Sequence, residues 1–227
     1  MAKATGVPLA KVASRVMLGA TLAQLRTEGL LRPVSDHAYV AIKEAVLPFN
    51  RFPEVDAALG PEMRSTGEVM GIDVSFGRAF YKAALAAGTV LPTTGTVFLS
   101  LADRDKPAGL VVANRLRALG LAITATAGTA RYLARFGLDV DQVVGKVSEG
   151  AGVTAVDLIA DGKVDFVINT PQGRGGRTDG EQIRKAANTH RVSLVTTVDA
   201  ALAAVSGMSE QAGQPLSVRT LQELHGR

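Results

Sequence analysis

The sequence contains no cysteine and no tryptophan, and only 4% of its 227 residues are aromatic. The absence of cysteine excludes disulfides and thiolate metal sites, and it is typical of proteins from a reducing compartment. A hydrophobic core must therefore be built from Val, Leu, Ile and Ala. The hydrophobic fraction of 47% supplies ample material for such a core.

Long hydrophobic runs are missing as well. No apolar run approaches the roughly 20 residues that span a bilayer. Lys3 lies near the start of the chain, but no apolar segment of the secretory type follows it. We therefore expect a soluble, cytoplasmic protein without a membrane partner.

Neither sign of charge dominates, since 25 Lys and Arg stand against 21 Asp and Glu, a formal net charge of +4. A surface that binds nucleic acid usually shows a longer basic stripe, often with aromatic side chains on which bases stack. Here the basic residues of the last third lack such aromatic neighbours. The pattern favours small anions over nucleic acid as ligands. These basic residues are Arg174, Arg177, Arg184, Lys185 and Arg191.

The first part of the chain shows helical periodicity. One apolar set follows the i, i+3, i+4, i+7 spacing of a helix with a single buried face. It consists of Leu9, Val12, Ala13, Val16 and Met17.

Further elements are predicted before the chain changes character. A short helix is expected over 22–28 and a strand over 39–47. Residues 48–71 are rich in Pro, Gly and charge, which predicts a loop with short extended pieces. Ser75 can cap a further helix, which should end at Gly88.

From residue 93 onward, strands alternate with helices. Apolar runs such as 97–99 are typical of strands buried on both faces. Five such strands predict a parallel, doubly wound α/β sheet with right-handed crossovers. We therefore expect two domains, at 1–90 and 93–227. The strands are predicted at 97–99, 121–125, 142–147, 164–168 and 192–196, and the helices at 108–119, 129–136, 153–160, 181–188, 200–205 and 217–225.

In a doubly wound sheet, ligands bind outside the carboxyl ends of the strands. The residues at these ends carry hydroxyl, amide or ammonium groups, and one strand leads into a glycine turn at a helix N-terminus. Such donors, with the positive end of a helix dipole, are what a phosphate ester needs. The expected anion site consists of Ser100, Thr126, Thr129, Lys146 and Asn169, with Thr196 ending the fifth strand and Lys106 close enough to reach the same edge.

Each of these residues also has an ordinary structural explanation. Ser and Thr after a strand are more often turn formers or helix caps than ligands. Lys146 alone would be a solvated charge, and Asn169 could hold the loop 171–180. Gly128-Thr129 is too short for a phosphate-loop fingerprint. An anion site is favoured only because all five strand ends carry polar groups of this kind.

Catalysis is poorly supported in the second domain. The three histidines stand at no strand end, and the acids near the edge form no evident acid–base pair. A nucleophile elbow, a paired-histidine metal motif and a Walker loop are all missing. The domain is therefore interpreted as a binding module without catalytic or metal-binding residues. The histidines are His37, His190 and His225, and the acids are Asp103, Asp105, Glu149 and Asp179.

Three segments of the first domain resemble the large subunit of carbamoyl-phosphate synthetase. They are Lys3–Lys11 (KATGVPLAK), Ile42–Phe52 (IKEAVLPFNRF) and Gly60–Gly71 (GPEMRSTGEVMG), of which the third is close to diagnostic. By the same resemblance, residues 1–90 are a mainly helical remnant from the end of the second ATP-grasp half. Residues 93–227 resemble the family's regulatory domain, which has the methylglyoxal-synthase-like fold.

The resemblance implies an activity for the full enzyme, which is a ligase. Its large subunit uses ATP, with Mg or Mn, to make carbamoyl phosphate from bicarbonate and ammonia. A glutaminase small subunit supplies the ammonia from glutamine, and the product serves pyrimidine and arginine biosynthesis. In bacterial enzymes the regulatory domain binds nucleotide effectors such as UMP and IMP, and ornithine binds between the synthetase and regulatory domains.

The resemblance also assigns residues of this chain to these ligands. Ornithine would meet Glu44 and Thr196, a carboxylate for its amino group and a hydroxyl on the facing domain. Pro171 stands where the family often has a second Thr, and Gly180 replaces its usual Ser, which leaves the identity of the effector open. The nucleotide phosphate pocket would comprise Ser100, Lys106, Thr126, Thr129, Lys146 and Asn169.

The Gly-rich loop, the adenine-binding strand and the acidic metal ligands of the ATP-grasp half are expected to precede residue 1. The hypothesis is therefore a truncated or split large subunit that holds no cofactor of its own. On this hypothesis the chain alone cannot synthesise carbamoyl phosphate.

Two alternatives remain. A stand-alone lyase of the methylglyoxal-synthase type, acting on dihydroxyacetone phosphate, needs a carboxylate base and a histidine at the same edge. An interaction module would instead dock residues 1–90 onto a separately encoded synthetase chain through apolar residues such as Phe76, Phe80 and Leu85. As a remnant, residues 1–90 should be the less stable part, and limited proteolysis should leave a core that begins near Pro92.

Overall fold

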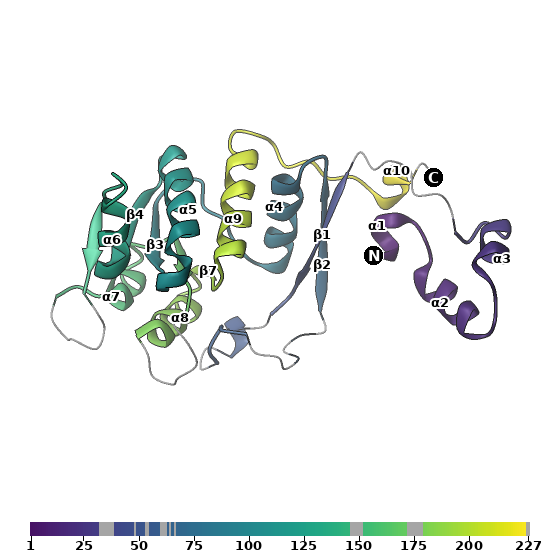
Figure 1. Ribbon diagram of the computed structural model, residues 1–227, viewed down its shortest axis with the longest axis horizontal. Helices are drawn as coiled ribbons and strands as arrows, with labels where there is room; N and C mark the ends of the chain where they lie inside the picture. The colour runs from purple at the N-terminus through teal and green to yellow at the C-terminus, as the bar shows by residue number, and fades with distance from the viewer. Residues whose placement is uncertain are drawn as a thin grey trace.

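The computed structural model describes residues 1–31, 39–47, 49–52, 55–59, 63, 65, 67–145, 152–171 and 179–225. The molecule is elongated (Figure 1). A parallel sheet with its helices occupies one end, a two-stranded sheet lies beyond it, and short N-terminal helices lie at the other end.

A five-stranded sheet forms the centre of the second half of the chain. All neighbouring strands are parallel, and their order is β5-β4-β3-β6-β7. The predicted α/β fold class with five parallel strands is confirmed. The strands are β3 (Thr96–Ser100), β4 (Ala122–Thr126), β5 (Gln142–Val144), β6 (Phe166–Asn169) and β7 (Ser193–Val195).

Alternate residues of the central strands point into two different cores. Val97 and Leu99 of β3 belong to one hydrophobic cluster, and Phe98 between them belongs to the other. This follows from the two-residue period of a strand, and it explains why such a strand is apolar throughout. The first face is covered by α5 (Lys106–Ala118), α6 (Ala127–Ala134) and α9 (Val198–Gln211), and the second by α7 (Ala155–Ala160) and α8 (Asp179–Thr189).

The strand order reverses between β3 and β6. The chain first adds β4 and β5 on one side of β3 and then crosses to add β6 and β7 on the other. At such a switch point the carboxyl ends of neighbouring strands open into a crevice. Ser100 and Asn169 are register partners at these two ends, so the topology itself brings two predicted site residues together.

A smaller antiparallel unit precedes this sheet. Strands β1 (Val40–Ala45) and β2 (Glu68–Asp73) pair with each other, and α4 (Phe76–Ala87) packs across both. A Cβ at Gly71 would lie 2.0 Å from the backbone oxygen of Ala79 in α4. Only a residue without a side chain allows the two backbones to approach this closely.

Helix α4 joins this unit to the parallel sheet. Its other side packs against α9, and its residue Ala84 belongs to the same hydrophobic cluster as α5 and β3. Figure 1 shows α6, α5, α9 and α4 standing side by side in one row. The division into domains 1–90 and 93–227 stays a prediction, and the last helix of the first domain shares a core with the second.

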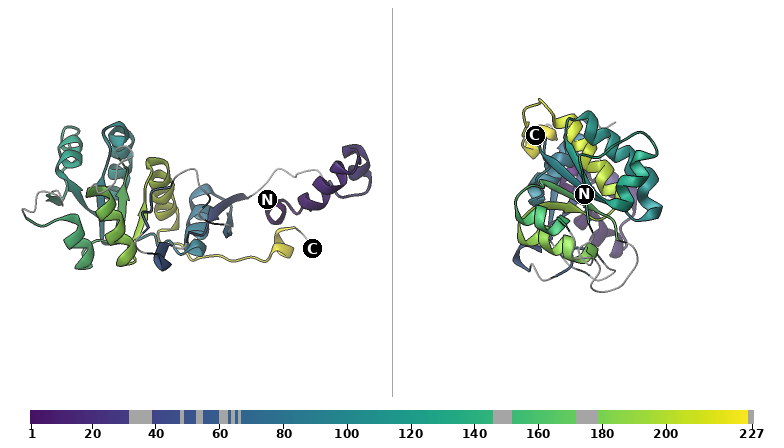
Figure 2. Two further views of the ribbon diagram at one scale, coloured as in Figure 1. Left: turned by 90° about the horizontal axis from the view of Figure 1, so that it is seen from below. Right: turned by 90° about the vertical axis from the view of Figure 1, so that its left-hand side faces the viewer.

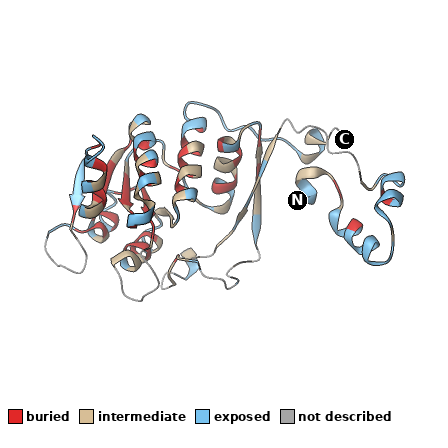
Figure 3. Ribbon diagram, in the orientation of Figure 1, coloured by how far each residue is buried: buried red, intermediate tan, exposed pale blue. Residues whose placement is uncertain are grey.

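The first 31 residues have little core of their own. Their helices bury a small cluster around Leu25. The predicted apolar periodicity of α2 is confirmed as a helix, but side chains such as Met17, which is 88% exposed, face solvent (Figure 3). The helices are α1 (Ala2–Thr5), α2 (Leu9–Met17) and α3 (Leu22–Thr27).

The last described helix of the chain lies near the N-terminal helix α1 (Figure 2). Nε2 of His225, at the end of α10 (Leu221–Leu224), lies 2.8 Å from the backbone oxygen of Lys3. The helix predicted over 217–225 is shorter than expected. It begins only after Thr220, whose hydroxyl accepts a hydrogen bond from the backbone N–H of Glu223 and so caps the first turn.

The segment 48–71, predicted as a loop with short extended pieces, contains the 3-10 turn η1 (Phe49–Arg51) and the start of β2. Pairing of β2 with β1 outweighs the poor strand propensity of Gly71. Two further sequence predictions need correction. Helix α9 extends beyond the predicted 200–205, because Met208 in its last turns is buried in the core. Ser75 holds the N-cap position of α4, but its hydroxyl bonds Glu210 of α9 instead of the helix.

In the residues that the structure describes, none of the helices has both the length and the apolar character of a membrane-spanning helix.

Candidate functional site

Three adjacent strands end at the same edge of the parallel sheet, and each carries a predicted site residue. Ser100 ends β3, Thr126 ends β4 and Asn169 ends β6, with β3 between the other two. Asn169 is buried, with 2% of its surface exposed, whereas Ser100 and Thr126 are half-buried. The predicted residues therefore gather at the crevice that the switch point forms.

Two threonine hydroxyls hold the segment that follows β3. Oγ1 of Thr129 accepts a hydrogen bond from the backbone N–H of Leu101 at 3.0 Å. Oγ1 of Thr170 accepts one from the backbone N–H of Ala102 at 2.8 Å. All four groups are buried, and buried N–H groups require partners. Thr129 thus serves the structure of the site, and Thr170, which sequence reasoning did not select, serves it in the same way.

The helix that follows β4 begins at this edge with an uncapped N-terminus. Thr126 is the N-cap residue of α6, but its Oγ1 donates to Oγ1 of Thr129 at 3.1 Å and forms no capping hydrogen bond with the helix. With respect to the described residues, the first N–H groups of α6 therefore keep their hydrogen-bonding capacity for a ligand. Together with the positive end of the helix dipole, these groups favour an anion.

Lys106 brings a cation to the same turn. It begins α5, its side chain is 14% exposed, and its Nζ lies 3.7 Å from the place that a Cβ at Gly128 would take. Nζ also pairs with Oδ1 of Asp103 at 2.5 Å, and this hydrogen bond lowers the pKa of Asp103. The prediction that Lys106 reaches the edge agrees with this position, and a bound phosphate would compete with Asp103 for the ammonium.

A buried arginine holds Asn169 in place. Arg184 of α8 is 4% exposed, and its Nη1 donates to Oδ1 of Asn169 at 2.7 Å. Its Nε and Nη2 donate to Oδ1 and Oδ2 of Asp56, both at 2.6 Å. Sequence reasoning missed this role, although a cation between the apolar residues Ile183 and Ala187 of a predicted helix was a usable signal.

Asp56 remains ionised at neutral pH. Burial by itself would raise its pKa, but the hydrogen bonds from Arg184 and from the backbone N–H of Ala58 outweigh burial and lower the pKa below the ordinary value. The carboxylate and the guanidinium therefore form a charged, bidentate pair.

Several predicted residues lie elsewhere. Lys146, His37 and Glu149 lie outside the described residues. His190 follows the last turn of α8, and His225 ends α10, so neither stands at the carboxyl end of a strand.

Glu44 and Thr196, predicted for an ornithine-type activator, come from different sheets. Glu44 lies on the face of β1 that packs against α4, the same face as Gly71, and Thr196 follows β7. Oε2 of Glu44 is buried without a hydrogen-bond partner among the described residues. Burial raises the pKa of Glu44. A carboxylate in this state would gain from an ammonium ligand.

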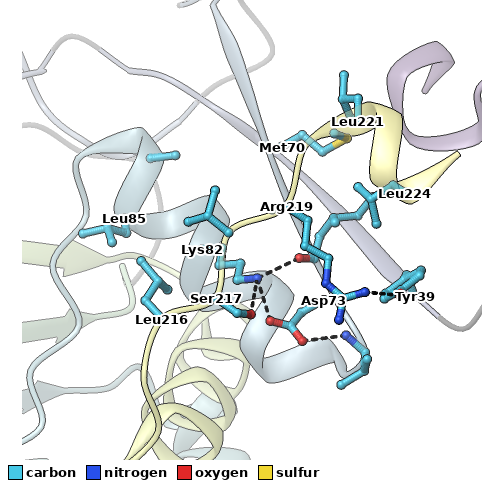
Figure 4. A pocket seen from close by; sticks show the side chains of 15 residues that line it. Tyr39, Met70, Asp73, Lys82, Leu85, Leu216, Ser217, Arg219, Leu221 and Leu224 are labelled. Carbon is cyan, nitrogen blue, oxygen red and sulfur yellow. Dashed lines mark hydrogen bonds and ion pairs between the residues drawn. The ribbon is translucent and has the colours of Figure 1, made fainter. Parts of the chain in front are cut away.

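A separate cavity of about 370 Å³ lies near the far end of β2, where α4 and the C-terminal segment meet. Figure 4 shows its polar side, where Nζ of Lys82 lies 2.7 Å from Oδ2 of Asp73 and 3.2 Å from the hydroxyl of Ser217. Burial would raise the pKa of Asp73, but hydrogen bonds, chiefly from Lys82, lower it. Ser100, Thr126 and Asn169 do not line this cavity, so it is distinct from the candidate site.

The order of the parallel strands and the polar residues at their carboxyl ends indicate the class to which this domain belongs. Residues 109–196 match the family model described as an MGS-like domain. The five-stranded parallel sheet with its helices is therefore an MGS-like domain, as the resemblance implied.

The whole chain is similar to carbamoyl phosphate synthase large chains. It is 46% identical to that of Synechocystis sp. over 226 residues, which make up 100% of this chain and 20% of the relative. It is 50% identical to that of Mycobacterium tuberculosis over 242 residues (99% and 22%) and 50% identical to that of Beutenbergia cavernae over 238 residues (98% and 21%). The chain thus spans about a fifth of the length of these relatives, and its similarity is to their C-terminal region.

Proposed function

We propose that this chain acts as the effector-binding C-terminal part of a cytoplasmic carbamoyl-phosphate synthetase large subunit. The carboxyl edge of the MGS-like sheet would hold the phosphate of a nucleotide such as UMP or IMP. The identity of 46% to 50% along the whole chain supports this assignment.

One observation carries the proposal. The uncapped N-terminus of α6 and the ammonium of Lys106 meet at one turn, where Nζ lies 3.7 Å from the Cβ position of Gly128. Backbone N–H groups supply directed donors to phosphate oxygens, and a largely shielded ammonium supplies charge. Ser100 borders the same edge with a hydroxyl that can donate. The set suits binding and orientation of a phosphate ester.

The chemistry of the full enzyme is proposed for other residues. The rest of the large subunit would bind ATP with Mg or Mn and make carbamoyl phosphate for pyrimidine and arginine biosynthesis, and a glutaminase subunit would supply ammonia from glutamine. In the part of the chain that the structure describes, no group of three His, Asp or Glu could hold a metal ion. We therefore expect these 227 residues alone to form no carbamoyl phosphate. ATP-dependent product formation by the purified chain would contradict this.

The nucleotide site is tested by calorimetric titration with UMP and then IMP. Replacing either proposed phosphate ligand, in Lys106→Ala or Lys146→Ala, should weaken binding by about 1.5–3 kcal/mol, as expected for hydrogen bonds to a charged group. The matched control is Lys163→Ala, because Lys163 pairs with Asp161 at 2.8 Å on an exposed surface before β6. Equal affinity in all variants, or no binding by the folded wild-type chain, would refute the proposed site.

Ornithine is proposed to bind near Glu44, whose buried Oε2 lacks a partner among the described residues. Glu44→Gln should abolish heat of ornithine binding, and Thr196→Val should weaken it. Ornithine binding that survives Glu44→Gln would place the activator elsewhere.

The two alternatives can be tested with the same sample. A lyase of the methylglyoxal-synthase type would produce methylglyoxal from dihydroxyacetone phosphate. We do not expect this product, because such a lyase needs a histidine beside its carboxylate base, and both described histidines, His190 and His225, lie away from the edge. An interaction module would dock through the exposed faces of Phe76 and Leu85, which are 47% and 44% exposed. Phe80, in contrast, packs against the core.

A further inference from the structure

The buried guanidinium of Arg184 connects two parts of the molecule that are far apart in sequence. On one side it donates two hydrogen bonds of 2.6 Å to the carboxylate of Asp56, in the segment between β1 and β2. On the other side it donates one of 2.7 Å to the side-chain oxygen of Asn169, at the end of β6. Three of the five N–H donors of the guanidinium are thus used, in a fork whose geometry is rigid.

The surroundings leave this link little freedom. Arg184 is 4% exposed and Asn169 is 2% exposed. A Cβ at Gly180 would lie 3.0 Å from Nη1 of Arg184 and 3.3 Å from Oδ1 of Asn169. The backbone of α8 therefore closes over the contact, and the absence of a side chain at 180 makes room for it. A change in the position of Arg184 must therefore alter its contacts with both Asp56 and Asn169.

The contact also orients the amide of Asn169. Its oxygen accepts a hydrogen bond from Arg184, and because the amide group is planar, this contact also fixes the position of its N–H₂ group. Ser100 is the register partner of Asn169 at the end of β3. Asn169 thus stands at the same edge as the proposed phosphate-binding turn, with its orientation set by Arg184.

We infer that Arg184 is a positioning residue that couples this edge to the segment between β1 and β2. It orients the amide of Asn169 toward an anionic ligand, and Asp56 in turn fixes the guanidinium. The inference rests on the proposed nucleotide site. It adds a route by which ligand binding at that site affects a segment outside the parallel sheet. By thermodynamic reciprocity, fixing the segment between β1 and β2 in place should increase the affinity for the ligand, and ligand binding should in turn restrict the motion of this segment.

Simple charge attraction does not account for the arrangement. An ordinary surface ion pair needs no third partner, and exposed pairs contribute little. Here the third hydrogen bond goes to a neutral amide at the carboxyl end of a central strand. The segment that carries η1 also contacts α8, so the ion pair is continuous with a packed interface.

The test compares the full chain with two variants that break the link differently. Asp56→Asn removes the carboxylate charge but keeps the shape, and Arg184→Lys keeps the positive charge but cannot span both partners. Asp161→Asn is the matched control, because Asp161 also forms an ion pair, with Lys163 at 2.8 Å, but on an exposed surface. Affinity for UMP is measured by calorimetry, and thermal unfolding is followed in parallel.

We expect both link variants to bind UMP about 10-fold more weakly, within the range of roughly 5- to 150-fold typical of coupled sites, while the control is unchanged. UMP should also slow hydrogen exchange at the backbone amides of residues 55–59 in the wild-type chain and leave them unchanged in Arg184→Lys. The wild-type half of this second readout does not depend on the folding of either variant.

Two results would overturn the inference, and they are distinguishable from each other. If the wild-type chain binds UMP but the variants bind it equally well, or UMP leaves the exchange of residues 55–59 unchanged, Arg184 serves only the fold, even if the variants melt earlier. If the folded wild-type chain binds no nucleotide, the proposed site itself fails and the coupling fails with it.

Discussion

Two short amphipathic helices at opposite ends of the molecule differ sharply in what they bury. Helix α7 has 6 residues and buries Ala155, Leu158 and Ile159. Helix α2 has 9 residues and buries only Val12. Both show the apolar spacing that predicts a helix. Short helices owe their stability to tertiary packing more than to propensity, so the parallel sheet supplies α7 with a partner surface that α2 lacks within the described chain.

The unit made of β1, β2 and α4 is intermediate between these extremes. It has no parallel sheet of its own, but α4 shares a hydrophobic cluster with α9 and β3. The molecule therefore presents a gradient of burial from the MGS-like domain to the N-terminal helices (Figure 3). The following predictions test this gradient, beginning with the largest expected effect.

The first prediction compares two fully buried side chains from the two ends. Phe166 of β6 and Leu25 of α3 are both 0% exposed. Phe166→Ala should lower the global free energy of unfolding by about 3–5 kcal/mol, because it leaves a cavity in the main core. Leu25→Ala should leave global unfolding in urea nearly unchanged, because the cluster around it is small. An equal loss in the two variants would show that the N-terminal helices unfold together with the sheet.

The second prediction concerns the close packing of β2 on α4. Gly71→Ala should destabilise the chain by about 1–3 kcal/mol, since its Cβ would lie 2.0 Å from the backbone oxygen of Ala79. Gly67→Ala is the matched control, because the nearest atom to its Cβ would be at an ordinary 3.6 Å. Urea unfolding of both variants gives the comparison. If Gly71→Ala leaves the free energy of unfolding unchanged, α4 and the hairpin separate easily.

The third prediction distinguishes the sequence-based boundary from the observed packing. Sequence reasoning predicted a protease-resistant core that begins near Pro92. Because α4 shares a core with α9, we expect the resistant fragment to retain Phe76–Ala87 and to lose residues 1–31 first. Limited proteolysis followed by mass spectrometry of the fragments decides between the two starts. A fragment that begins at Pro92 would show that α4 detaches readily.

The smallest effect is expected from two carboxylates of the hairpin with opposite pKa shifts. Burial raises the pKa of Glu44, so between the ordinary glutamate value of about 4.3 and the raised one the folded state holds a proton that the unfolded chain has lost. Stability due to Glu44 therefore falls as pH rises through this window. At pH 7, Glu44→Gln should raise stability by about 0.5 kcal/mol and change little below the window.

Glu68 is the control with the opposite sign. Its hydrogen bond from Lys43 lowers its pKa, so its contribution is present above the ordinary value and is lost as pH falls through the lowered one. Glu68→Gln should therefore give no gain at pH 7. Melting temperatures over a pH series check both variants. A gain at pH 7 from Glu68→Gln, or none from Glu44→Gln, would contradict the assignment.

Much of the candidate site was predictable from local pattern. Ser100, Thr126 and Asn169 stand where each apolar run ends, and parallel strands in a doubly wound sheet bring such ends to one edge. Lys106 followed from its place before a predicted helix. Thr170 and Arg184 were missed, because their roles depend on partners 68 and 128 positions away, Ala102 and Asp56.

The α/β class, the order of strands and helices and the polar character of the strand ends follow from local sequence patterns alone. These features depend on apolar residues that recur every two or 3.6 positions and on glycines in turns, and both signals act over a few neighbouring positions. Three other features emerge only in the folded chain: residues 68–73 form a strand, α4 shares a core with α9, and Arg184 joins Asp56 to Asn169. Each of these depends on contact between distant segments, and their free energy arises from burial and pairing that no local window contains.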